Sequence, residues 1–177
     1  MYNGAIAKKN ATLGSWSEVQ NQYQRRADLV PNLVEIVKGY AAHEREVLEA
    51  VTEARAKAVQ INIDPDNMTP EQLTQYQTVQ NKLSQEVSRL FLVAENYPQL
   101  RASENFLSLQ SQLGETENRI AHARSSFIEA ARDYKTYIES FPTNVTLGVI
   151  VPGKFKPIPF FEASPGTEKA PEIKFRN

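Results

Sequence analysis

Apolar side chains recur at helical spacing along the first third of the chain. Two rows with a seven-residue repeat run from Ile6 to Arg55 and from Lys9 to Ala58, and most of their positions are apolar or aromatic. Such spacing predicts a helix that buries one coiled-coil-like stripe. Because the stripe keeps its phase through Pro31, the pattern predicts one helix from about residue 3 to about residue 61.

Pro31 is the residue that this helix must accommodate. A proline inside a helix removes one hydrogen bond and crowds the carbonyl four residues earlier, here that of Ala27. A break at Pro31 would make Val30 the N-cap, and valine is a poor cap, whereas Asp28 is a good one. Two interpretations follow: one helix kinked at Pro31, or two nearly collinear helices that meet near 28–31. The unbroken phase favours the kinked helix.

Two further long helices follow the first. Thr69 followed by Pro70 and Gln72 has the pattern of a capping box with proline in the first turn, so a helix is expected to start there. Its stripe continues to Tyr97, which precedes Pro98. Ser103 is the expected N-cap of the third long helix, which ends at Pro142.

The last part of the chain has a different composition. Six of the ten prolines lie between residues 142 and 171, and this density excludes a regular helix. The segment is nevertheless rich in apolar and aromatic residues, so we expect it to pack, and to fray after about residue 163. The sequence therefore predicts an all-α fold. An antiparallel bundle of three to four long helices (1–142) precedes an extended proline-rich segment (143–177).

Composition excludes several classes of protein. Lys plus Arg is 20 and Asp plus Glu is 21, so the formal net charge is -1, without the basic excess of a nucleic-acid-binding protein. The chain has no cysteine, which excludes disulfides and thiolate chemistry. It contains no run of about 18 apolar residues that would span a bilayer.

Candidate catalytic and metal-binding motifs fail on inspection. The stretch HEREVLE (43–49) begins like a zinc-protease motif, but Val47 stands where the second histidine should be. Tyr40 and Arg119 stand three residues before the two histidines, His43 and His122, so no Glu-x-x-His pair exists. We expect no enzymatic activity, no cofactor and no metal.

A polar cluster surrounds Pro31 and the end of the same stripe. It is the candidate interaction surface, and its residues are Arg25, Arg26, Asp28, Asn32, Tyr40, His43 and Glu44. Glu44, Gln20 and Gln80 fall on the predicted apolar stripes. Because buried polar groups need partners, we interpret these three mainly as residues that fix helix register.

Three blocks of the sequence resemble the LemA family. They are YNGAIAKKNATLGSWSEVQNQYQRRADLVPNLVEIVKGYAAHE (2–44), SRLFLVAENYPQLRASENFLSLQSQLGETENRIAHARSSFIEAARDYKTYIESFP (88–142) and the closing FFEA…KAPEIKF. The resemblance spans nearly the whole chain. It implies a small helical protein of the bacterial envelope with one transmembrane helix just before the position of Tyr2. Since Met1 directly precedes Tyr2, we expect this chain to lack that anchor.

The resemblance supplies no reaction and no catalytic residue. Together with the long amphipathic helices and the lack of a catalytic motif, it leads us to expect a membrane-anchored, single-pass interaction or scaffold protein that binds an unidentified protein partner or itself. The charge balance predicts that it binds no nucleic acid. The alternative function is a ligand-binding sensor module whose site lies near the Pro31 kink and the His43-Glu44 turn.

Overall fold

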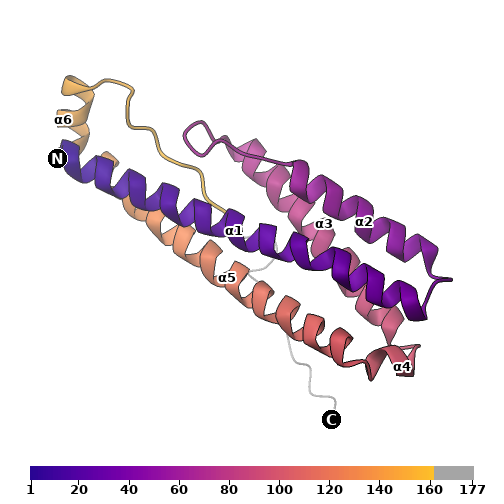
Figure 1. Cartoon of the computed structure of the whole chain (residues 1–177). Coiled ribbons are helices and arrows are strands. Elements are labelled where there is room, and N and C mark those ends of the chain that lie inside the picture. The colour runs from indigo at the N-terminus through magenta and orange to yellow at the C-terminus, as the bar shows by residue number, and fades with distance from the viewer. Residues whose placement is uncertain (162–177) are drawn as a thin grey trace, which may run out of the picture.

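The computed structural model describes residues 1–161, which form six helices and no strand. In chain order these are α1 (Tyr2–Tyr40), α2 (Arg45–Gln60), α3 (Pro70–Ala94), α4 (Pro98–Arg101), α5 (Glu104–Glu139) and α6 (Thr143–Ile150). Figure 1 shows α1 lying along α5, with α2 and α3 beside the C-terminal half of α1. The prediction of an all-α chain is confirmed for the described residues.

The first helix continues through Pro31 without a break. Pro31 lies inside α1 and is exposed, while Val30 and Leu33 beside it are fully buried. The predicted continuity past the proline is therefore confirmed, and the interpretation as two helices that meet near 28–31 is wrong.

The predicted single helix from 3 to 61 is also wrong, because the chain leaves the helix at Ala41. Ala41 has φ -131° and ψ 48°, and Glu44 has φ -83° and ψ 45°, so neither residue is helical. The stripe keeps its phase across the break because α1 and α2 bury their apolar faces in the same core. Ala41 itself is fully buried between Val37 and Val47 in that core.

The carbonyl that Pro31 deprives of its helical partner is satisfied from the neighbouring helix. Pro31 has no N–H to donate to Ala27 O. Arg55 of α2 donates from Nε to that oxygen over 2.8 Å. The contact pairs residue 27 with residue 55, on opposite sides of the turn at 41–44, so α1 and α2 run antiparallel. The missing bond of Pro31 thus becomes a cross-link between two helices.

A double-mutant cycle tests this compensation. We expect Arg55→Met to cost about 1–2 kcal/mol of unfolding free energy, the value of a hydrogen bond from a charged donor. In a Pro31→Ala background the new N–H takes the Ala27 carbonyl, so the same change should cost little. The coupling of about 1 kcal/mol is measured by urea unfolding. Lys57→Met, on the same helix, is the control. An equal cost of Arg55→Met in both backgrounds would contradict the explanation.

The predicted caps of the next two long helices are present. Thr69 Oγ1 accepts a hydrogen bond from Gln72 N at 3.2 Å, and Gln72 Oε1 accepts one from Thr69 N at 3.0 Å, which completes the capping box. Ser103 Oγ accepts from Phe106 N at 3.5 Å at the start of α5. The second predicted helix is shorter than expected, since α3 ends at Ala94 and the short α4 follows.

Contacts along the molecule define its two ends. Tyr137 Oη donates to Met1 O, and Thr12 Oγ1 donates to Ala130 O, so α5 runs antiparallel to α1. The terminal end carries Met1 and α6, and the turn end carries residues 40–45 and α4 (Figure 1). With 39 residues, α1 spans roughly 57 Å between them.

The C-terminal part of the described chain is helical before it is extended. Residues Thr143–Ile150 form α6, so the expectation of an extended segment from residue 143 is wrong there. The helix fits between Pro142 and Pro152, with no proline inside it. Residues 151–161 then run along the helices and bury Ile158 and Phe161. The predicted fraying after residue 163 lies outside the described residues.

Candidate functional site

Arg26, one of the predicted surface residues, is buried in the interior. Only 2% of it is exposed. Its Nη2 donates to Gln80 O at 2.7 Å and to Gln80 Oε1 at 2.9 Å, and its Nη1 donates to Glu117 Oε1 at 2.9 Å. Arg26 therefore does not belong to an interaction surface. Its long side chain reaches partners on α3 and α5 that the sequence near Pro31 does not contain.

Arg26, Gln80 and Glu117 form a polar layer that separates two apolar clusters. One cluster lies toward the turn end and starts at Ala27, and the other lies toward the terminal end and includes Tyr23 and Trp16. Gln80 completes the layer by donating from Nε2 to Ala58 O at 3.1 Å. Gln80 was expected on sequence grounds to be buried and to need partners, and its partners are Arg26 and α2.

Two tyrosines adjoin the layer on its terminal side. The Arg26 guanidinium lies 5.0 Å from the Tyr23 ring centroid, and Tyr23 packs edge-on against Tyr76. Desolvation raises the pKa of both phenols above its ordinary value, and for Tyr23 the positive charges of Arg124 and Arg26 partly oppose the rise. Both rings thus stay neutral at physiological pH. The layer joins α1 to α3 and α5 in the interior of the protein.

Three predicted residues on α1 remain at the surface. Arg25, Asp28 and Asn32 are exposed. Asp28 Oδ1 accepts a hydrogen bond from Gln24 Nε2 at 2.8 Å, and the described contacts contain no ion pair between Arg25 and Asp28. These side chains are a solvated face of the helix.

The remaining predicted residues gather at the turn end. Tyr40 is 47% exposed and His43 is exposed. Glu44 Oε1 accepts a hydrogen bond from Tyr97 Oη at 3.0 Å, which raises the pKa of that phenol and ties the α1–α2 turn to the segment before α4. The structure therefore brings Tyr40, His43 and Glu44 together at the turn, which Tyr97 holds from the connection between α3 and α4.

The largest hollow next to these residues is a groove between α1 and α2 that sequence analysis missed. Its volume is about 860 Å³. It is lined by Val34, Glu35, Lys38, Ala42, Arg45, Leu48, Glu49, Thr52, Glu53 and Ala56, which we call the α1–α2 groove. Val34 and Leu48 lie against the core cluster of the turn end, while the acidic and basic side chains stand at the walls. Lys57 holds the pKa of Glu53 below its usual value, so that wall carboxylate stays charged.

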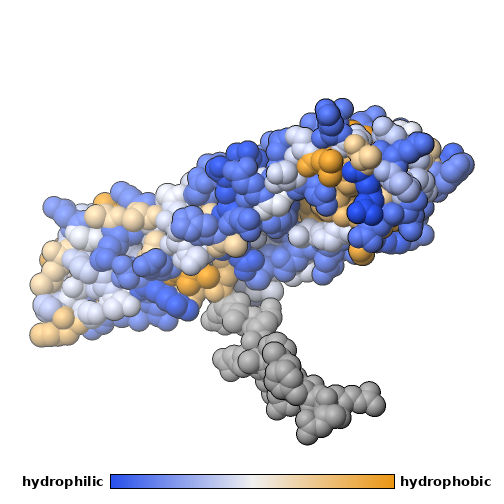
Figure 2. All heavy atoms as spheres, turned by 90° about the horizontal axis from the view of Figure 1, so that it is seen from below, coloured by the Kyte–Doolittle hydropathy of each residue, from blue (hydrophilic) through white to orange (hydrophobic). Residues whose placement is uncertain are grey.

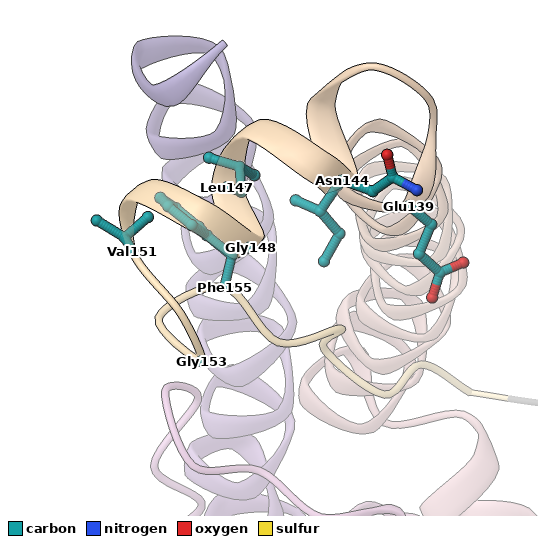
Figure 3. Close-up of a pocket in the computed structure, with 8 residues that line it drawn as sticks. Glu139, Asn144, Leu147, Gly148, Val151, Gly153 and Phe155 are labelled. Atoms are coloured by element: carbon teal, nitrogen blue, oxygen red, sulfur yellow. The ribbon is translucent and has the colours of Figure 1, made fainter.

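Two smaller hollows lie away from α1 and α2. One, of about 440 Å³, lies between α3, α4 and α5 beside exposed Leu92 and Leu107. The other, of about 290 Å³, lies at the terminal end between α5 and α6, and Figure 3 shows Glu139 and Leu147 at its edge. Glu139 is the only charged residue that lines it, so it has no set of converging catalytic groups.

Two further findings concern residues 1–161. Within that range, no group of three or more His, Asp or Glu side chains is placed to hold a metal ion. None of the helices described here has the length and apolar character needed to cross a bilayer. The second histidine, His122, is exposed on α5, far in sequence from His43.

Comparison with known proteins identifies the family. The sequence matches the LemA family over residues 15–175. The chain belongs to the LemA family. The resemblance predicted from the three sequence blocks is therefore confirmed.

Curated relatives of this LemA-family protein fall into two groups by name. Magnetosome protein MamQ 2 of Paramagnetospirillum magneticum is 25% identical over 181 residues, 93% of this chain and 65% of that protein. Protein LemA of Metamycoplasma hominis is 26% identical over 148 residues, 78% of this chain and 63% of that protein. Magnetosome protein MamQ of Magnetospirillum gryphiswaldense is 24% identical over 182 residues, 93% and 63% respectively. The chain thus spans less than two thirds of the length of these relatives.

Proposed function

We propose that this LemA-family protein is a membrane-associated interaction or scaffold protein of the bacterial envelope, which binds a partner protein in the α1–α2 groove. The groove carries the proposal. It is an open hollow of about 860 Å³ with apolar side chains at its base and charged side chains at its walls. Amphipathic helices bind in grooves of this kind, with apolar anchors below and polar contacts at the rim.

The walls of the groove provide charges of both signs. Lys38 and Arg45 stand at the end near the turn, whereas Glu49 and Glu53 continue along α2. Complementary charges at a rim set the orientation and the rate of association more than the affinity. A partner helix with the opposite order of charges would therefore bind in one direction.

Contacts between the helices hold the groove in its shape. Arg55 joins α2 to α1, the Tyr97–Glu44 hydrogen bond holds the turn between them, and the Arg26 layer fixes α1 against α3 and α5. A preformed site loses less conformational entropy when its partner binds. These contacts suit a protein whose task is to present a fixed surface.

Membrane association is supported by the relatives. The names of several relatives place them among magnetosome proteins, and the resemblance to the LemA family implies association with a membrane. The sensor alternative finds less support. Around Pro31 the side chains of Val30 and Leu33 are fully buried, and Glu44 is already engaged by Tyr97.

Site-specific cross-linking tests the groove. We expect a photo-cross-linker at Thr52, in the groove, to capture one protein from native membranes. The same group at Thr78, outside it, should capture none. The two threonines are matched: both are exposed, and each hydroxyl donates to the carbonyl four residues earlier, that of Leu48 or Thr74.

A variant that fills the groove makes the test quantitative. Ala56 lines the groove and Ala11 lies on α1 outside it, and both are exposed. Ala56→Trp should weaken binding of the purified partner by about tenfold or more, as expected for a blocked contact in an interface. Ala11→Trp should leave it unchanged. Equal capture at both threonines, or equal binding by both tryptophan variants, would disprove a site in the groove.

A further inference from the structure

Apolar side chains are concentrated at the terminal end of the molecule. Five of the nine large apolar residues that are exposed in residues 1–161 lie there. These five form the end patch: Met1 (53% exposed), Phe141 (83%), Val145 (56%), Val149 (78%) and Ile150 (63%). Thr146 Oγ1 lies 3.3 Å from Met1 Sδ, so the start of the chain and α6 share one surface. Figure 2 shows apolar surface at this end of the molecule.

Four of the five end-patch residues lie in one long uncharged stretch. Residues 140–153 contain no Asp, Glu, Lys or Arg, although charged residues make up 23% of the chain. Only Thr143 and Leu147 of α6 are buried against the rest of the protein. The outer face of α6 therefore presents aliphatic side chains to the surroundings. Contiguous exposed apolar surface in an otherwise polar protein marks a contact site.

The shape of the end patch argues against a partner helix as its occupant. The hollow at this end is small, about 290 Å³, and is lined by inward residues such as Leu147 and Phe155. None of the end-patch residues lines it. The patch side chains are instead exposed to the surroundings, by 53% to 83%. An exposed apolar tip of this kind inserts more readily into a lipid bilayer, which deforms around it, than into a preformed groove on another protein.

Aromatic and basic side chains border the patch. Tyr2 packs edge-on against Phe155 at 5.6 Å, and the Lys154 ammonium contacts the Tyr2 hydroxyl and ring. Lys156 follows two residues later and is exposed, while Glu139 is the acidic group at the border. Tyrosines and lysines around an apolar tip are typical of side chains at a membrane–water interface, where lysine attracts anionic headgroups.

We propose that the end patch inserts into the interface of a bilayer that contains anionic lipids, with Lys154 and Lys156 against the headgroups. This inference rests on the membrane part of the proposed function and does not depend on what the groove binds. In this arrangement α1 leads away from the lipid over roughly 57 Å, because its 39 residues rise about 1.5 Å each. The α1–α2 groove, at the opposite end, is then presented away from the membrane.

Fluorophores at single introduced cysteines test the orientation, since the chain has no native cysteine. The two sites are Val149→Cys in the end patch and Leu92→Cys near the turn end, exposed by 78% and 63%. Each variant carries a nitrobenzoxadiazole label and is mixed with vesicles of phosphatidylcholine and phosphatidylglycerol in equal amounts. We expect a blue shift and quenching by brominated lipid only for the label at residue 149. A response at both sites, or at neither, would overturn the proposal.

Charge substitutions measure the strength of the contact. Val145→Asp with Val149→Asp should weaken vesicle partition by at least about tenfold, because apolar insertion is lost. Leu92→Asp with Leu107→Asp should not. All four positions are exposed, so each variant should keep the circular dichroism of the parent.

Lys154→Gln with Lys156→Gln should lower binding to anionic vesicles and make it less salt-dependent. A label response without vesicles that disappears on dilution would assign the patch to a second copy and overturn the lipid assignment. A lipid contact that fails while the groove still binds its partner leaves the scaffold role intact.

Discussion

Arg26→Ala is expected to destabilise the protein by about 3–5 kcal/mol, because it removes a large buried side chain together with its hydrogen bonds. The guanidinium is 2% exposed and makes three hydrogen bonds, two to Gln80 and one to Glu117. Its removal leaves Gln80 Oε1 without its hydrogen-bond donor and opens a cavity between the two apolar clusters. Urea unfolding followed by far-UV circular dichroism measures the loss.

The neighbouring Arg25 is the matched control. It is exposed on the same helix, so Arg25→Ala should change stability by no more than about 0.5 kcal/mol. Arg26→Lys should also destabilise, because an ammonium cannot reproduce the fork that contacts both Gln80 and Glu117. Equal effects of the two alanine changes would show that the buried position of Arg26 contributes nothing.

A second variant separates specificity from stability. Arg26→Met combined with Gln80→Leu removes the charge and its main buried partner together, and Glu117, which is 43% exposed, returns to solvent. Such paired replacements of buried polar groups are often close to neutral. We expect the double variant to recover most of the stability lost in Arg26→Ala. If the layer fixes the register of α1 against α3, the recovered protein should bind the groove partner more weakly than the parent does.

The long helices and their starts could be predicted from the sequence because their signals are local. Thr69 with Gln72 and Ser103 with Phe106 are contacts within four residues, and the structure contains both. The turn at 41–44 was missed because the apolar stripe continues across it. A stripe records which residues face the core, and α1 and α2 face the same core from opposite directions.

The candidate site was harder to predict because its parts are distant in sequence. The local sequence does not distinguish Arg26 from its exposed neighbour Arg25. The difference comes from Gln80 and Glu117, which lie on other helices and bind Arg26. The α1–α2 groove exists only after the chain reverses at 41–44, so no window of sequence contains it. Tyr40, His43 and Glu44 were predicted from their residue types and their position in the sequence, and they do lie together. They do so where the chain reverses at 41–44, a reversal that the predicted single helix from about residue 3 to about residue 61 does not contain.

Trp16→Ala is expected to cost about 3–5 kcal/mol as well, by loss of a large buried side chain. Trp16 is fully buried, and its ring lies 5.3 Å from Tyr76, 5.2 Å from Phe127 and 6.1 Å from Phe161. Leu92→Ala, at a position 63% exposed, is the control and should change stability by less than about 0.5 kcal/mol.

The effect of this variant should extend to the terminal end. Phe161 anchors residues 151–161 on the aromatic cluster around Trp16, and this segment follows directly from α6 and the end patch. A cavity at Trp16 weakens that anchor, so limited proteolysis should cut residues 151–157 earlier in Trp16→Ala than in Leu92→Ala. Trp16→Phe fills much of the space and leaves out the indole N–H, which has no partner among the described residues, so it should cost clearly less than Trp16→Ala. Unchanged proteolysis in a destabilised Trp16→Ala protein would mean that the 151–161 segment is held by Ile158 and its neighbours, independently of the aromatic cluster.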